Sequence, residues 1–123
     1  MEYRVAVSPD GPWIEITIHA PVTAEVERHF ATEAVAAAKA HDLTDFLVDA
    51  TRTANIAETF EQYQFAYRDV KGLDLDKNAR IAVLVSPGDA SHDFIETLLR
   101  NAGFSCRSFR DRDAAYAWLR EEA

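Results

Sequence analysis

Six polar residues follow two short apolar runs, at the places where predicted parallel strands would end. They are Asp49, Thr51, Arg52, Asn55, Ser86 and Asp89. The group after residues 46–48 supplies a carboxylate, hydroxyls, a guanidinium and a predicted helix start, a combination that can receive an anion. The group after residues 81–85 adds a hydroxyl and a carboxylate. Open parallel sheets bind ligands outside the carboxyl ends of their strands, so these residues form the candidate site for a ligand or partner.

The same residues also suit a purely structural role, and the sequence leaves both interpretations open. Asp and Thr side chains often hydrogen-bond to the backbone of the turn that they begin, so Asp49 and Thr51 would satisfy their own turn. Asn55 followed by Glu58 resembles a capping box, which predicts that a helix begins at Asn55. In that case the polar groups would be hydrogen-bonded within the protein and would not be available to a ligand.

The sequence contains no arrangement typical of a catalytic or metal site. A nucleophile elbow, a phosphate-binding lysine loop and a dinucleotide glycine motif are all missing. Ser91, His92 and Asp93 are contiguous, whereas catalytic triads are assembled from separated positions. The four histidines lie on different predicted elements without a paired spacing, and Cys106, the one cysteine, lies in a predicted strand. We therefore expect no enzyme activity, no metal and no cofactor.

The elements that would position these residues alternate between strands and helices. Apolar patterning predicts strands near residues 3–7, 14–18, 46–49, 81–85 and 104–109. Helices are predicted to begin after the capping residues Thr23, Asn55, Ser91 and Asp111. The order ββαβαβαβα predicts an α/β fold whose mixed, mostly parallel five-stranded sheet starts with a β-hairpin. We expect a single domain over residues 1–123.

Charge and hydropathy narrow the classes of partner. The chain has 123 residues, 48% of them hydrophobic, and a formal net charge of −8. This acidic balance disfavours nucleic acid, because the average surface repels phosphate backbones. The sequence also has no apolar run long enough for a membrane span, so we expect a cytoplasmic protein without membrane insertion.

One aromatic residue of the second predicted helix suggests a surface for self-association. On a helical wheel that starts at Ile56, the side chains of Phe60 and Tyr67 share one apolar face. Phe65 falls on the opposite face, beside Gln62. The wheel therefore predicts that Phe65 points outward, where it would contact a partner or a second copy of the chain in a homodimer.

The succession of elements resembles the SpoIIAA-like branch of the STAS superfamily over almost the whole chain. The resemblance rests on the initial hairpin, the apolar runs at 46–49 and 81–85, and the tail. In that tail a glycine, a short strand, a Phe-Arg pair and a helix with Ala-Trp-Leu follow in close order; these are Gly103, Phe109, Arg110, Ala117, Trp118 and Leu119.

The resemblance implies a non-enzymatic binding or regulatory module that acts through a protein partner or a small ligand. In anti-sigma-factor antagonists of this branch, a serine is phosphorylated at the start of the second helix. Residues 51–55, which occupy that place here, read Thr-Arg-Thr-Ala-Asn and lack this serine. Relatedness to SEC14-type carriers implies an alternative function, the carriage of a small apolar ligand or lipid.

Overall fold

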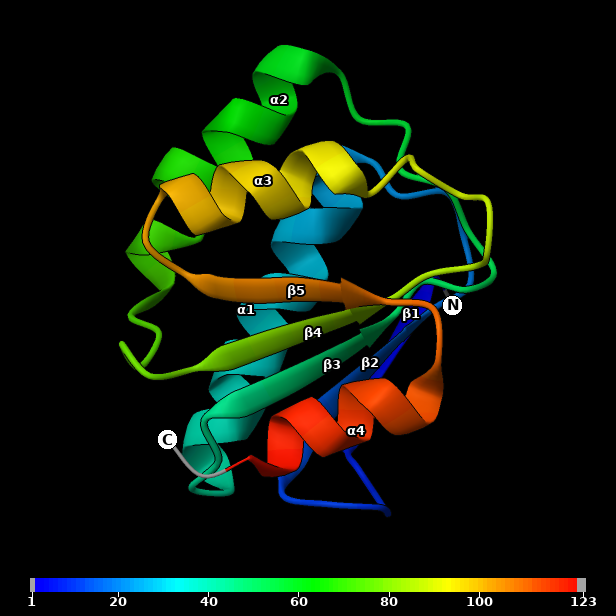
Figure 1. The fold of residues 1–123 in the computed structure, drawn as a ribbon. Helices are drawn as coiled ribbons and strands as arrows, with labels where there is room; N and C mark the ends of the chain where they lie inside the picture. The colour runs from blue at the N-terminus through cyan, green and yellow to red at the C-terminus, as the bar shows by residue number, and fades with distance from the viewer. Residues whose placement is uncertain (1, 122–123) are drawn as a thin grey trace.

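The computed structural model describes residues 2–121 and contains a five-stranded sheet in the order β1-β2-β3-β4-β5 (Figure 1). Its strands are β1 (Tyr3–Val7), β2 (Trp13–Ile18), β3 (Asp45–Asp49), β4 (Arg80–Leu84) and β5 (Ser105–Phe109). β1 runs antiparallel to β2, and the pairs β2–β3, β3–β4 and β4–β5 are parallel. The structure confirms the predicted mixed, mostly parallel sheet with an N-terminal hairpin.

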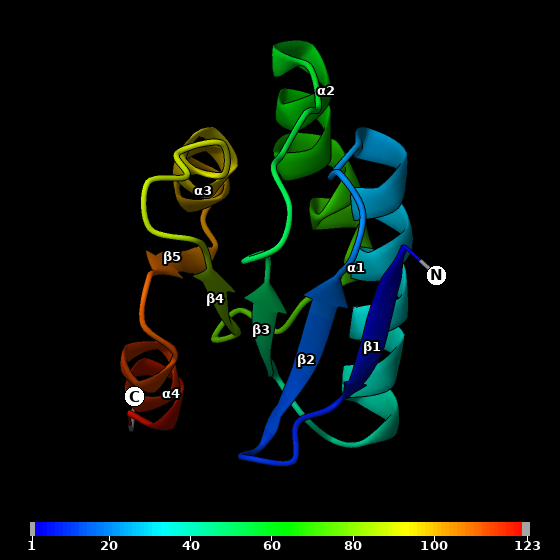
Figure 2. The same cartoon turned by 90° about the vertical axis from the view of Figure 1, so that its right-hand side faces the viewer.

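Helices cover both faces of this sheet. They are α1 (Ala24–Ala40), α2 (Thr59–Gln64), α3 (Asp93–Asn101) and α4 (Arg112–Arg120). α1 and α3 lie on one side of the sheet and α4 lies on the other (Figure 2). Within residues 2–121, no helix combines the length and the apolar character needed to cross a membrane.

The alternation of side chains along the strands divides the core into two layers. Phe46 and Ile81 belong to the layer under α1 and α3, whereas the next residues along each strand, Leu47 and Ala82, face α4. Ala115 of α4 is fully buried against that second layer, where its small side chain permits close packing. Both faces of β3 and β4 are therefore covered, which explains why their sequences are continuous apolar runs.

Three predicted local signals are confirmed because each acts within one turn of the chain. Thr23 Oγ1 accepts a hydrogen bond of 3.2 Å from the Val26 amide at the start of α1. Asp111 caps α4 in the same way through the Ala114 amide. Gly103 follows α3 with a φ of 102°, a left-handed conformation that glycine adopts readily.

The start of the second helix differs from the prediction. Asn55 does not cap it; the helix begins after Glu58, whose side chain forms a reciprocal capping box with Glu61. α2 then continues as a π-helical segment, Phe65–Asp69, in which the Val70 amide bonds to the carbonyl of Phe65, five residues earlier. The predicted cap at Ser91 is also wrong, because α3 follows His92 and the Ser91 hydroxyl accepts a hydrogen bond from the Asn55 amide.

The predicted orientation of Phe65 is also wrong. Its side chain is only 6% exposed and packs with Val70 against α3, whereas Phe60 is 64% exposed. The wheel correctly separates Phe65 from Phe60 and Tyr67, but the aromatic stripe that it assigned to the core is exposed and the opposite face is buried. The π-helical segment places Val70, five residues after Phe65, on the same buried side.

Candidate functional site

The strand-end residues predicted to bind a ligand are largely engaged with each other and with α4. Asp49 ends β3 on the same face as Leu47, so its carboxylate meets α4 rather than the layer under α1. It accepts hydrogen bonds from the Thr51 amide at 3.1 Å, from the Thr51 hydroxyl at 2.7 Å and from the Arg112 guanidinium at 2.7 Å. Burial opposes its charged form, yet these bonds outweigh burial and hold the pKa of Asp49 below its usual value.

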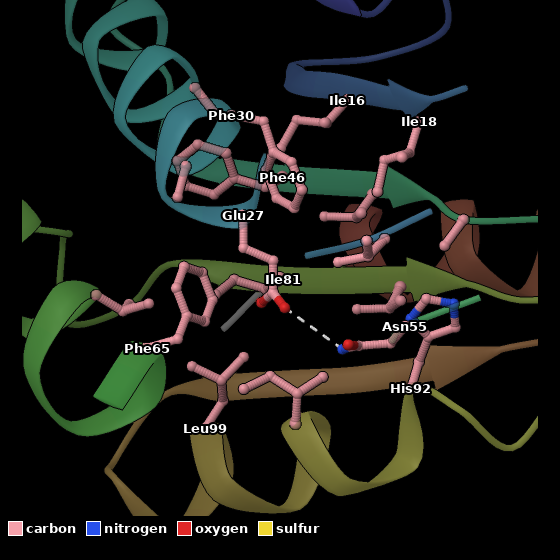
Figure 3. Close-up of a pocket in the computed structure, with 18 of the residues that line it drawn as sticks. Ile16, Ile18, Glu27, Phe30, Phe46, Asn55, Phe65, Ile81, His92 and Leu99 are labelled. Carbon is pink, nitrogen blue, oxygen red and sulfur yellow. Dashed lines mark hydrogen bonds between the residues drawn. The ribbon is translucent and has the colours of Figure 1, made fainter. Parts of the chain in front are cut away.

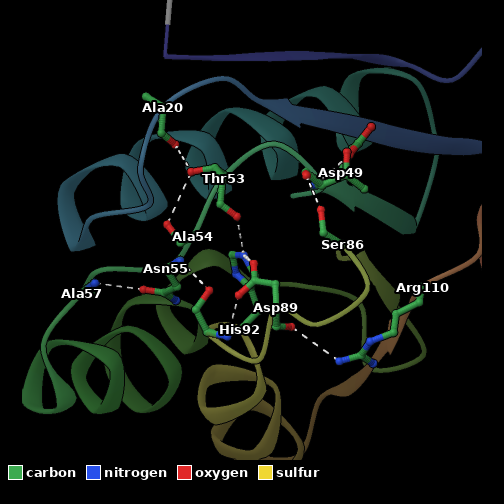
Figure 4. A network of polar contacts seen from close by, with 12 residues as sticks. Ala20, Asp49, Thr53, Ala54, Asn55, Ala57, Ser86, Asp89, His92 and Arg110 are labelled. Carbon is green, nitrogen blue, oxygen red and sulfur yellow. Dashed lines mark hydrogen bonds and ion pairs between the residues drawn. The ribbon is translucent and has the colours of Figure 1, made fainter.

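The loop after β4 is tied to the same region (Figure 4). The Ser86 hydroxyl donates to the carbonyl of Thr51. Asp89 accepts a hydrogen bond of 2.9 Å from the Ser91 amide, which lowers the pKa of Asp89. His92, which is buried, places Nε2 3.1 Å from the Thr53 carbonyl oxygen and so joins the two loops.

Asn55 completes this network, and Arg52 lies exposed beside it. The Asn55 amide donates to the Ser91 hydroxyl at 2.9 Å, and its side-chain oxygen accepts from the Ala57 amide at 3.0 Å. Arg52 lies on the exposed surface. The structure therefore brings five of the six predicted residues into one network, which provides hydrogen-bond partners for polar groups of the loops after β3 and β4. Binding by this set stays a prediction.

The chemistry available in the described part of the chain is limited. Residues 2–121 contain no group of three or more His, Cys, Asp or Glu side chains placed to hold a metal ion. Cys106 is buried in β5, and this burial raises the pKa of its thiol to about 12, so the sulfur stays protonated and poorly nucleophilic near neutral pH.

The structure contains a cavity of about 100 Å³ between the sheet and the helices above it, a feature that the alternative of apolar-ligand carriage requires (Figure 3). β2, β3 and β4 form its floor, and α1, α3 and the π-helical segment form its walls. Its lining is almost entirely apolar and includes Ile16, Phe30, Phe46, Phe65, Ile81 and Leu99. The cavity is partly open rather than a sealed void.

Glu27 places a carboxyl group in this largely apolar lining. It extends from α1 into the cavity and is 3% exposed, with Oε1 3.4 Å from Asn55 Nδ2 (Figure 3). Burial raises the pKa of Glu27 to about 8, against the opposing effect of the Asn55 hydrogen bond. Its spacing from Phe30 and Ala34 places it on the core face of α1, and that spacing was the signal available in the sequence.

The geometry defines a small α/β fold with a mixed sheet, a partly open apolar cavity and a polar network whose members hydrogen-bond to one another at the strand ends. The sequence model described as SpoIIAA-like matches residues 13–120. The chain belongs to the SpoIIAA-like family, which confirms the resemblance drawn from the hairpin, the apolar strands and the tail.

A similar fold is found in a crystal structure of an uncharacterised protein from the DUF3478 family, with a SpoIIAA-like fold, from Shewanella loihica PV-4. The two chains are 17% identical, with a TM-score of 0.59, and the similarity covers 95% of this chain and 91% of the other. At this identity the likeness concerns the fold. A search of curated proteins found no match.

Proposed function

We propose that this SpoIIAA-like domain is a non-enzymatic binding module that holds a small apolar molecule between its sheet and α1, α3 and the π-helical segment. The observation that carries the proposal is the apolar cavity of about 100 Å³. Ligand sites are concave, mostly apolar and lined by a few well-placed polar groups, which is the character of this lining. SpoIIAA-like domains generally bind or regulate rather than catalyse, and this supports the non-enzymatic part.

The size of the cavity restricts the ligand. An engineered cavity of about 150 Å³ in another protein stays dry and binds benzene. A volume of about 100 Å³ therefore suits a molecule of one small ring or a short chain. The sequence left a small apolar ligand and a lipid open as alternatives, and this volume favours the small ligand over a complete lipid.

Benzene titration followed by amide NMR tests the proposal. We expect saturable shifts confined to the residues around the cavity. Ala34→Leu extends a side chain from α1 into the cavity, so it should weaken benzene binding by at least about tenfold. Ala36→Leu is the matched control, because it makes the same change on the exposed side of α1 and should leave binding unaltered. Benzene shifts that do not saturate, or that Ala34→Leu leaves unchanged, would contradict the proposal.

The second candidate function is recognition of a protein partner, and an exposed aromatic patch favours it. The patch consists of Ile56, Phe60, Tyr63, Tyr67 and Phe94. Tyr63 stacks on Tyr67 with ring centroids 6.1 Å apart and meets Phe94 edge-on at 5.7 Å. Contiguous exposed apolar surface commonly marks a contact site, and this patch replaces Phe65 as the proposed homodimer surface. The exposed guanidinium of Arg52 remains a proposed contact at the strand ends.

Sedimentation of the unmodified chain and of Phe60→Glu separates these cases. If the patch joins two copies, the unmodified chain should sediment as a dimer and the variant as a monomer, because a carboxylate would be desolvated in the contact. Asp113→Asn changes an exposed residue of α4, on the other side of the sheet, and serves as the control. An unmodified chain that sediments as a monomer would remove the homodimer and leave a different protein as the partner.

A further inference from the structure

The carboxyl group of Glu27 is buried with one long hydrogen bond. It lies among apolar side chains of the cavity, with Phe30, Phe46 and Ile81 around it (Figure 3). Its contact with Asn55 Nδ2 is long, at 3.4 Å, and within residues 2–121 it forms no second hydrogen bond to a side chain. A carboxyl group has two oxygens and can form more hydrogen bonds than this one, so Glu27 can bond to a molecule in the cavity.

Charged side chains on α1, α2 and the π-helical segment act on Glu27. Glu61 of α2 and Asp69 of the π-helical segment add negative charge and raise its pKa, whereas Arg28 of α1 opposes them. Arg28 is itself 3.9 Å from an Asp69 oxygen. His92, in the loop before α3, lines the cavity and is engaged with the Thr53 carbonyl. With its pKa raised to about 8, Glu27 is a carboxylic acid at neutral pH and carries one hydroxyl donor.

This environment discriminates between classes of small ligand. An anionic headgroup would lie beside Glu27, with Glu61 and Asp69 nearby, and would be repelled. An ammonium group would be attracted by Glu61, Asp69 and an ionised Glu27, but it would have to leave water and Glu27 would have to ionise inside an apolar cavity. The desolvation of a buried ion pair can exceed its Coulombic gain. A neutral oxygen acceptor needs neither step, because it receives the hydroxyl hydrogen of the acid and leaves both groups uncharged.

We propose that Glu27 selects the ligand of this cavity, which is a small, uncharged molecule with an apolar body and one hydrogen-bond-accepting oxygen, such as a ketone. This inference rests on the proposed binding function and adds the chemical class of the ligand. Glu27 donates the hydrogen bond, and the remaining lining contacts the hydrocarbon part.

The test compares three probes that have as many non-hydrogen atoms as benzene: 2-pentanone, butanoate and pentylammonium. Binding to the full chain is followed by amide NMR. At about pH 6.5 the ketone should bind at least about tenfold more tightly than either ion. At about pH 9.5, where Glu27 is ionised, ketone affinity should fall at least about threefold because the acid hydroxyl is gone.

Two variants connect the result to Glu27. Glu27→Gln keeps a donor of similar shape, so it should retain ketone binding and lose the pH dependence. Glu27→Leu removes the donor and should weaken the ketone while benzene still binds. The inference is overturned if butanoate or pentylammonium binds as tightly as the ketone, or if ketone affinity follows the same pH course in Glu27→Gln as in the unmodified chain.

The benzene titration distinguishes a failure of ligand selection by Glu27 from a failure of the proposed binding function. Saturable benzene binding without preference for the ketone would overturn the role of Glu27 and leave the cavity as an apolar binding site. Absence of binding by benzene and by all three probes would overturn the binding function, and the selection by Glu27 with it.

Discussion

Between about pH 5 and pH 8, the free energy of unfolding of the unmodified chain is expected to fall by roughly 1 kcal/mol per pH unit. In Glu27→Gln this fall should be absent. Burial raises the pKa of Glu27 from 4.5 to about 8 in the folded chain. In this range the folded chain retains the proton and the unfolded chain has lost it. The unfolded state therefore binds fewer protons, and the free energy of unfolding falls as the pH rises.

The sign and the window follow from that shift. The stabilising contribution of protonated Glu27 is complete below about pH 4.5 and is lost as the pH rises through about 8. Asp49 and Asp89 have lowered pKa values, so their contributions change at more acidic pH and do not mask the effect. Over the full window the difference between the unmodified chain and Glu27→Gln should reach about 3 kcal/mol, a large share of typical domain stability.

Urea unfolding at several pH values measures this effect. Glu25→Gln is the matched control, because it makes the same substitution in the exposed first turn of α1 and should preserve the slope of the unmodified chain. Parallel slopes for the unmodified chain and Glu27→Gln would show that the Glu27 carboxyl ionises normally in the folded state. The inference about its hydroxyl donor would then lose its electrostatic basis.

Phe65→Ala should cost about 3–5 kcal/mol of stability, whereas Phe60→Ala should change it by no more than about 0.5 kcal/mol. Phe65 is 6% exposed and packs with Val70, Leu98 and Leu99, so truncation removes buried contacts and enlarges the cavity. Phe60 is 64% exposed on the outer side of α2. The pair makes the same chemical change on opposite sides of one continuous segment.

Chemical denaturation of both variants provides the measurement. Equal losses would contradict the burial of Phe65 and the exposure of Phe60, and a larger loss for Phe60→Ala would support the orientation drawn from the helical wheel. Benzene binding offers a second readout, because the larger cavity of Phe65→Ala should still accept the probe if the variant remains folded.

The sequence was informative wherever structure depends on neighbours within one turn or along one strand. The side chains of Thr23 and Asp111 cap their helices by accepting hydrogen bonds from amides three residues further along the chain. Gly103 ends α3 through its own left-handed conformation. The apolar run at 81–85 predicted a strand covered on both faces, and β4 has that position in the sheet. The hairpin and the order of elements predicted the topology because right-handed crossovers leave few arrangements.

The candidate site depended on distances that local patterns do not contain. Asp49 and Arg112 are 63 residues apart in sequence and 2.7 Å apart in space, so the partner that satisfies Asp49 was not predictable from its own loop. The helical wheel separated Phe65 from Phe60 and Tyr67, but which of the two faces is buried depends on where α3 lies.

The sequence by itself determined the succession of strands and helices, the family and the acidic balance, because these follow from local patterning and composition. Only the tertiary structure decided that the strand-end polar groups satisfy one another, that Phe65 is buried, and that Glu27 enters an apolar cavity. The physical reason is that a cavity is the space left between side chains of several elements, and the pKa of a buried acid depends on all of them together.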